Sequence, residues 1–120
     1  MTMARILIAE DELAVQTFVS RALAHCGHET VAVADGLAAL AALKEASYDL
    51  LLTDIAMPGL DGIALALKAS KDYPDMRILL MTGYVSEQRR AHNLDALIHR
   101  VIAKPFTLEE ICAAVASELV

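Results

Sequence analysis

The chain has 120 residues, of which 57% are hydrophobic and 4% are aromatic, and it contains no tryptophan. Ten Lys and Arg residues against 16 Asp and Glu residues give a formal net charge of −6, which excludes a basic surface that covers the molecule and neutralises nucleic-acid phosphates. The first nine residues lack a signal-peptide pattern, and every later apolar run is too short to cross a bilayer. We therefore expect one domain over residues 1–120, with a core of small aliphatic side chains, located in the cytoplasm and binding neither nucleic acid nor membrane.

Short apolar runs alternate with longer segments of helical periodicity along the whole chain. The runs predict strands at residues 5–9, 30–34, 50–53, 78–81 and 99–103. The longer segments predict helices at residues 12–26, 36–46, 62–72, 86–96 and 107–119. This alternation indicates an α/β fold, a (βα)5 doubly wound parallel five-stranded sheet. We expect flavodoxin-like architecture, for which the strand order is 2-1-3-4-5.

Local signals support several of these helices. Thr107, followed three residues later by Glu110, predicts a capping box at the start of the last helix. Gly27 suits a left-handed residue just after the first helix. The apolar stripe expected on the first helix consists of Val15, Phe18, Val19, Ala22 and Leu23.

The two cysteines, Cys26 and Cys112, lie far apart in the sequence and form no C-x-x-C motif. This spacing indicates neither a disulfide framework nor a thiolate metal site. We expect two free thiols, buried or half-buried.

Four of the five predicted strands deliver polar groups to one edge of the sheet, and the second strand is followed by Asp35. Glu10 and Asp11 come after the first strand, Asp54 after the third, Thr82 after the fourth and Lys104 after the fifth. In an open parallel sheet, ligands bind outside the carboxyl ends of the strands, where the strand order reverses. The order 2-1-3-4-5 puts the second strand at the rim, so the four polar ends predict one shared site.

Three carboxylates at this edge would repel one another by about 4 kcal/mol per pair at 4 Å in a medium of effective dielectric 20. A cation is therefore expected among them, and ligands that are all oxygen atoms favour Mg²⁺. We expect Asp11, Asp54 and the backbone carbonyl of Ala56 to be direct ligands and Glu10 to act through a water molecule.

Lys104 and Thr82 complete an electrostatic cage for a phosphoryl group. Lys104 supplies a mobile positive charge for a phosphoryl oxygen or for the Asp54 carboxylate, and the Thr82 hydroxyl supplies a hydrogen-bond donor. Phosphoryl transfer requires little more than this cage and an in-line nucleophile. Asp54 is the expected nucleophile, and an aspartyl phosphate is the expected product.

These residues, in their order and spacing, resemble the receiver domains of bacterial two-component response regulators over essentially the whole chain. The matching segments are residues 6–12, 49–62, 81–84 and 103–106. The resemblance implies that Asp54 is phosphorylated by a sensor histidine kinase or a histidine phosphotransfer protein, and that the Lys104–Pro105 peptide bond is cis. It also implies a monomer or weak dimer whose output partner binds the face formed by the fourth helix, fifth strand and fifth helix.

That face is locally basic in this acidic protein, because it contains Arg89, Arg90, His92, His99 and Arg100. A solvated helix face would explain the same residues.

The chain departs from the family pattern at Val101, where receivers carry an aromatic residue that rotates on phosphorylation. We therefore expect the switch to depend on Thr82, its loop and the fourth helix, and Tyr84 is a candidate cover for the phosphoryl group. Residues 53–58 and 82–84 resemble the stand-alone CpdR-type receivers, which regulate ClpXP proteolysis. A longer regulator reduced to its receiver is an open alternative.

The residues around the acidic cluster disfavour two other functions. A magnesium phosphohydrolase generally carries a second acid two residues after its nucleophile, where this chain has Ala56. A flavodoxin-like cofactor binder needs a first loop that cradles phosphate, which Glu10, Asp11 and Glu12 would repel. We therefore expect a switch rather than an enzyme, and a phosphate sink or relay without its own output remains an alternative.

Overall fold

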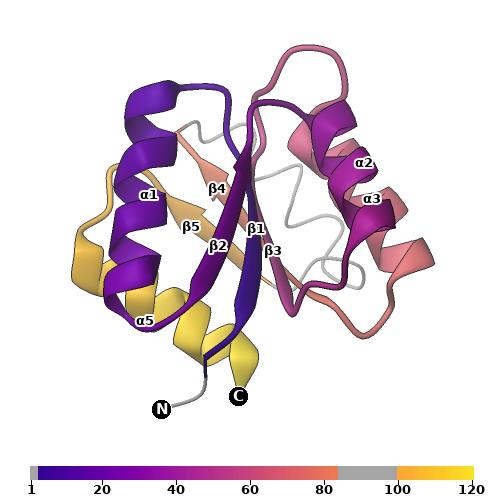
Figure 1. Cartoon of the computed structure of the whole chain (residues 1–120). Coiled ribbons are helices and arrows are strands. Elements are labelled where there is room, and N and C mark those ends of the chain that lie inside the picture. Colours follow the sequence, from indigo (N-terminus) through magenta and orange to yellow (C-terminus); the bar gives the residue numbers. More distant parts are fainter. Residues whose placement is uncertain (1–2, 84–99) are drawn as a thin grey trace.

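The computed structural model describes residues 3–83 and 100–120. Within these residues, five parallel strands form one sheet in the order β2-β1-β3-β4-β5, which confirms the predicted topology (Figure 1). The elements are β1 (Arg5–Ala9), α1 (Leu13–His25), β2 (Glu29–Val33), α2 (Gly36–Glu45), β3 (Leu50–Asp54), α3 (Gly62–Asp72), β4 (Arg77–Thr82), β5 (Arg100–Ala103) and α5 (Leu108–Leu119). No helix in this part of the chain is long and apolar enough to span a membrane.

The predicted helix at residues 86–96 lies outside the described residues. The same holds for Tyr84, and for Arg89, Arg90, His92 and His99 of the basic face.

The boundaries of the described elements agree with the predicted ones to within one residue. β2 begins and ends one residue earlier than predicted, because its register pairs Glu29 with Arg5 and Val33 with Ala9 of β1. β4 is one residue longer at each end, since Arg77 pairs with Leu50 and Thr82 with Ala103. The apolar runs locate each strand approximately, and pairing with the neighbouring strands sets its first and last residues.

Helices cover both faces of the sheet. Helices α1 and α5 lie on one face, and α2 and α3 lie on the other (Figure 1). Successive β1 side chains enter opposite layers: Ile6 and Ile8 pack with α1 and α5, whereas Leu7 and Ala9 pack with α2 and α3. Because both faces of the central strands are buried, they are apolar throughout rather than alternating.

The apolar face of α1 is narrower than predicted. Val19, Ala22 and Leu23 are buried, but Phe18 is 41% exposed. The Phe18 ring instead lies beside the ring of Phe106, with centroids 6.2 Å apart. The aromatic pair therefore joins the outer part of α1 to the segment that precedes α5.

Side chains and a glycine define several of the helix ends. Asp35 and Asp61 accept hydrogen bonds from the backbone N–H groups of Ala38 and Ala64, at the starts of α2 and α3. The capping box of Thr107 and Glu110 is confirmed at the start of α5. Gly27, with φ 92°, occupies the left-handed conformation just after α1. The cis Lys104–Pro105 peptide is confirmed as well.

The expectation of two free thiols is wrong. Cys26, the C-cap residue of α1, and Cys112, in the second turn of α5, form a disulfide with Cα atoms 6.5 Å apart. Sequence spacing could not reveal this pairing, because the two residues meet only when α1 and α5 pack on the same face of the sheet.

Gly62 is in close contact with the end of β3, the strand that carries Asp54. Its N–H donates to the carbonyl oxygen of Ile55 over 2.9 Å. A Cβ at this position would collide with the carbonyl oxygen of Asp54 and lie 2.8 Å from the Cα of Ile55, and both contacts are with backbone. The start of α3 can therefore approach the end of β3 this closely only because residue 62 is a glycine.

We expect Gly62→Ala to lower the free energy of unfolding by about 3 kcal/mol, because the backbone of β3 or α3 must move to accommodate the methyl group. Chemical denaturation measures this loss. Gly83→Ala is the control, since its Cβ would meet no described atom within 4 Å. Equal losses in the two variants would contradict the proposed collision.

Candidate functional site

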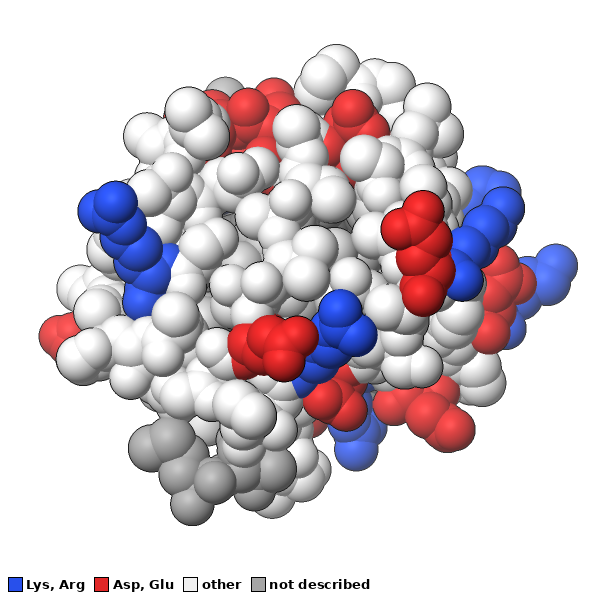
Figure 2. Space-filling model, viewed as in Figure 1, with Lys and Arg blue, Asp and Glu red and all other residues white. Residues whose placement is uncertain are grey.

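The polar residues that follow the strands meet at one edge of the sheet. Glu10 and Lys104 come directly after β1 and β5, and Asp54 and Thr82 are the last residues of β3 and β4. The parallel register aligns these ends, since Asp54 is level with Met81, one residue before Thr82. Figure 2 shows acidic side chains at the upper edge of the molecule, the edge at which the strands end in Figure 1.

Three carboxylates form the centre of the site. Glu10, Asp11 and Asp54 each offer an oxygen atom, and these atoms lie within 4.8 Å of one another. Glu10 and Asp54 are buried, whereas Asp11 is exposed. The site therefore has two carboxylates fixed in the protein and a third at the solvent side.

Lys104 bridges the two buried carboxylates. Its Nζ lies 2.8 Å from Oδ1 of Asp54 and 2.9 Å from Oε1 of Glu10. The contact with Asp54 matches one of the two roles predicted for Lys104, but its pairing with Glu10 was not foreseen. Because Lys104 lies 94 residues after Glu10, only the assembled sheet brings them together.

Backbone contacts hold Glu10 in place. Its Oε2 accepts a hydrogen bond of 3.0 Å from the N–H of Glu12. The amide of Gln16 donates to the carbonyl oxygens of both Glu10 and Val33, at 3.1 Å each. Gln16 thus ties the carboxyl ends of β1 and β2 together. Sequence reasoning missed it; the available signal was a polar side chain one turn after the predicted helix start.

Burial and ion pairing shift the pKa values of two site residues. Burial raises the pKa of Glu10 above its ordinary value, and the hydrogen bond from Lys104 only partly offsets this effect. Burial lowers the pKa of Lys104, but its bonds to Asp54 and Glu10 outweigh burial, so the pKa lies above its usual value. Lys104 therefore stays charged at neutral pH.

Thr82 and Ala56 lie at the carboxyl ends of β4 and β3. Thr82 is buried, and its carbonyl oxygen accepts a hydrogen bond of 2.8 Å from the N–H of Lys104. This bond joins the ends of β4 and β5. Ala56 lies two residues beyond Asp54, in the exposed part of the loop after β3.

The donor set fits a hard divalent cation. The three side chains offer carboxylate oxygens alone, which Mg²⁺ prefers and which soft metals do not. With all three ionised and Lys104 charged, the local charge is −3 + 1 = −2, which a divalent ion would balance.

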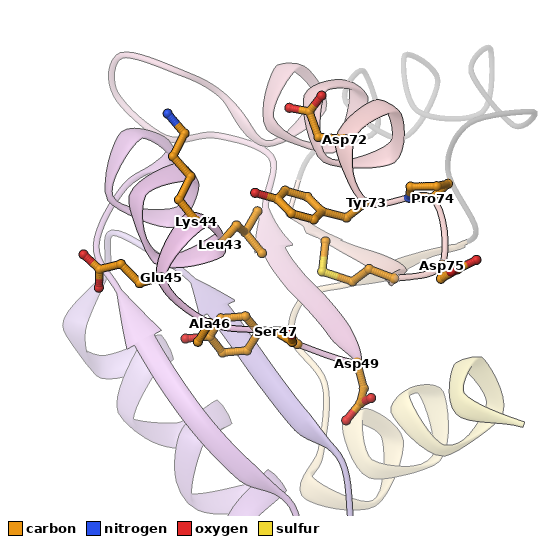
Figure 3. Close-up of a pocket in the computed structure, with 12 residues that line it drawn as sticks. Leu43, Lys44, Glu45, Ala46, Ser47, Asp49, Asp72, Tyr73, Pro74 and Asp75 are labelled. Atoms are coloured by element: carbon orange, nitrogen blue, oxygen red, sulfur yellow. The ribbon is translucent and has the colours of Figure 1, made fainter.

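A separate hollow of about 700 Å³ lies at the other end of the sheet, between the carboxyl ends of α2 and α3 (Figure 3). It is lined by Tyr48 and Asp49, just before β3, and by Tyr73 after α3. The length of β3 separates this hollow from Asp54, so it does not belong to the acidic site.

Comparison with known proteins gives a consistent result. The model of the response regulator receiver domain family matches residues 6–116. Response regulator receiver protein CpdR of Brucella abortus is 36% identical over 109 residues, which cover 91% of each chain. Transcriptional regulatory protein TcrA of Mycobacterium tuberculosis is 33% identical over 91% of this chain, but the match spans only 43% of its length. The solved structure of response regulator protein TrrA from Thermotoga maritima, in complex with Mg²⁺-BeF, has a TM-score of 0.87 at 29% identity and covers 96% of this chain and 98% of that chain.

We expect Lys104→Met to lower the free energy of unfolding by about 3 kcal/mol in a buffer with a metal chelator, because Glu10 and Asp54 lose their shared cation. Urea unfolding measures this change. Added Mg²⁺ should restore more stability to this variant than to the wild type, since the ion no longer competes with the ammonium group. Lys68→Met, on the exposed side of α3, is the control. A loss no greater than that of the control would mean that the bridge does not stabilise the fold.

The raised pKa of Glu10 predicts a pH dependence of stability. Between the unfolded value of about 4.5 and the higher folded value, the folded state binds more protons than the unfolded state. The stability of the wild type relative to Glu10→Gln should therefore fall as pH rises through this window. Urea unfolding of both proteins across acidic to neutral pH, with chelator present, measures the difference. A difference that grows with pH would show that attraction to Lys104 outweighs burial.

Proposed function

Because the chain belongs to the response regulator receiver family, whose members are phosphorelay signalling switches, we propose that Asp54 is its phosphoacceptor. One observation carries the proposal. A buried carboxylate at the carboxyl end of β3 lies within 4.8 Å of two other carboxylate ligands and 2.8 Å from the ammonium group of Lys104. An anionic nucleophile, carboxylate oxygens that can hold a cation and the positive charge of Lys104 thus meet at one edge of the sheet.

Asp54 acts as the nucleophile in this proposal. A carboxylate oxygen attacks the phosphorus atom of a phosphohistidine or a small phosphodonor. The new O–P bond forms as the P–N bond, or the P–O bond of the small donor, breaks, and the leaving group keeps the bonding electron pair. The product is an aspartyl phosphate on β3.

Lys104 and Thr82 respond to the charge that arrives with the phosphoryl group. Lys104 is held at the site by Glu10, so it can turn from Asp54 to a phosphoryl oxygen without leaving its second partner. Thr82, at the end of β4, offers a hydroxyl donor to another oxygen. Movement of Thr82 and its loop then carries the signal, because Val101 provides no aromatic ring on β5.

Receiver domains generally bind Mg²⁺ at an acidic pocket, and the oxygen ligands of this site fit the ion. We assign Asp11, Asp54 and the carbonyl of Ala56 as direct ligands and Glu10 as a ligand through water. When bound, Mg²⁺ neutralises charge on the phosphoryl oxygens. The solved TrrA complex with Mg²⁺-BeF supports this assignment by similarity.

Receiver domains are signalling switches rather than classical enzymes. We propose that this chain follows the same rule, since Ala56 stands where an aspartyl-phosphate hydrolase would carry a proton donor. The methyl group cannot protonate a leaving group. Hydrolysis of the phosphoaspartate is therefore left to water that reaches the site, and the chain signals by its phosphorylated state.

Receiver domains interact with histidine kinases or phosphotransfer proteins and with output domains. Two exposed leucines, Leu13 at 73% and Leu37 at 66%, lie in the first turns of α1 and α2, at the same edge as Asp54. We propose that a cytoplasmic phosphohistidine protein docks on these side chains. The output partner is assigned to the side of β5 and α5, together with the predicted helix at residues 86–96.

Intact-mass spectrometry tests the phosphoacceptor. We expect the wild type to gain about 80 Da, the mass of one phosphoryl group, from acetyl phosphate with Mg²⁺, and to gain nothing with chelator. Asp54→Asn should gain nothing under either condition. The matched control is Asp49→Asn, just before the start of β3, which should be labelled like the wild type. Labelling of Asp54→Asn at the wild-type level would overturn the assignment.

A further inference from the structure

The Cys26–Cys112 disulfide is a crosslink between two helices that are distant in the sequence. It joins the end of α1 to the second turn of α5 and closes a segment with a sequence separation of 86. The crosslinked helices cover the same face of the sheet (Figure 1). The bond therefore restrains one helix against the other and leaves the opposite layer, with α2 and α3, untouched.

Small molecules can reach this bond. Both cysteines are half-buried, and they line a hollow of about 500 Å³. The other lining residues are His28, Ala113, Ala116, Leu119 and Val120. Thiol–disulfide exchange requires direct attack on a sulfur atom. A disulfide that lines an open hollow meets this requirement in the folded protein, whereas one enclosed in the core would not.

The fold also accommodates the reduced cysteines. The Sγ of Cys112 lies 3.4 Å from the carbonyl oxygen of Ala22, so a thiol at this position has a hydrogen-bond acceptor. The contact between the helices does not depend on the bond alone, because Ile111 and Val115 of α5 are buried in the same cluster as Val19 and Leu23 of α1. Reduction should therefore loosen α5 without unfolding the protein.

We propose that Cys26 and Cys112 form a reversible redox site that restrains α5 when it is oxidised. In reduction, a dithiol gives two electrons and two protons to the protein disulfide; the S–S bond breaks, two thiols form and the dithiol becomes a cyclic disulfide. In oxidation, a small-molecule disulfide takes the same electrons and protons from the two thiols. The regulatory role rests on the cytoplasmic location expected from the sequence, where dithiols keep cysteines reduced and a disulfide forms mainly under oxidation.

The position of α5 makes this site relevant to signalling. Only Pro105, Phe106 and Thr107 separate Lys104 from α5, and the Phe106 ring lies against Phe18 of α1. α5 also belongs to the side of the molecule assigned to the output partner. Oxidation therefore acts on the mobility of the surface that a partner contacts, and Asp54 chemistry itself should be unaffected.

Maleimide labelling of the native protein, followed by intact-mass spectrometry, tests the proposal. After treatment with oxidised glutathione, the wild type should take up no label. After dithiothreitol in buffer without denaturant, it should take up two labels. Two labels after oxidation would overturn the disulfide. A bond that dithiothreitol reduces only in denaturant would overturn the reversible site and leave a purely structural crosslink.

Stability and exchange measurements separate the site from a general effect of the reagents. Reduction should lower the melting temperature by on the order of 10 °C. The disulfide closes a long loop in the unfolded chain, and breaking it raises the conformational entropy of the unfolded state. Amide hydrogen exchange in residues 108–119 should become several-fold faster. The double variants Cys26→Ser/Cys112→Ser and Cys26→Ala/Cys112→Ala should behave like the reduced wild type and show no response to dithiothreitol. A response in these variants equal to that of the wild type would overturn the proposal.

Acetyl phosphate labelling provides an independent readout. The oxidised and reduced wild type should both gain one phosphoryl group at Asp54 to the same extent. Failure of labelling in both states would contradict the phosphoacceptor assignment and leave the redox site intact. A loss of labelling only after reduction would contradict the inference that the redox site acts on α5 alone.

Discussion

Two buried carboxylates can share one edge of this sheet only because a cation lies between them. At an effective dielectric of 20, two such charges 4 Å apart repel by about 4 kcal/mol, a large fraction of the stability of a small domain. The Nζ of Lys104, within 2.9 Å of both Glu10 and Asp54, offsets this cost. The dependence runs in both directions. β5 must pair with β4 to bring Lys104 to the site, and the carboxylates of Glu10 and Asp54 keep that lysine in its charged form.

The same edge is shaped by close backbone packing. The loop between β3 and α3 passes so near to its neighbours that a Cβ on Gly36, at the start of α2, would lie 2.5 Å from the carbonyl oxygen of Leu60. Asp35 and Asp61 cap the two helices at this edge. Gly36 and Gly62 thus allow the loop that carries Ala56 to pack closely against the starts of α2 and α3. Close packing around a small oxygen-lined site suits Mg²⁺, which tolerates little departure from octahedral geometry.

The other side of the site connects to α5 through a short segment. Lys104 bridges the two buried carboxylates, Phe106 contacts Phe18 of α1, and Cys112, in the second turn of α5, is bonded to Cys26 at the end of α1. Charge at Asp54, through Lys104, and the proposed redox state of the cysteines would thus both act near the start of α5. A partner that binds β5 and α5 would sense both, although the first acts through electrostatics and the second through a covalent restraint on helix motion.

The sequence by itself determined the fold class, the strand order and the set of polar residues at the carboxyl edge. Apolar runs buried on both faces, helical periodicity and glycine or capping signals are local properties, and a parallel sheet necessarily brings the ends of its strands to one edge. Tertiary structure decided which of these groups touch. Four features depend on how α1, α5 and the strand ends pack. They are the Lys104–Glu10 pair, the hydrogen bonds of the Gln16 amide between β1 and β2, the exposed ring of Phe18 and the Cys26–Cys112 bond. Residues about 90 positions apart carry no local signal of their contact, because their proximity arises only when the chain has folded.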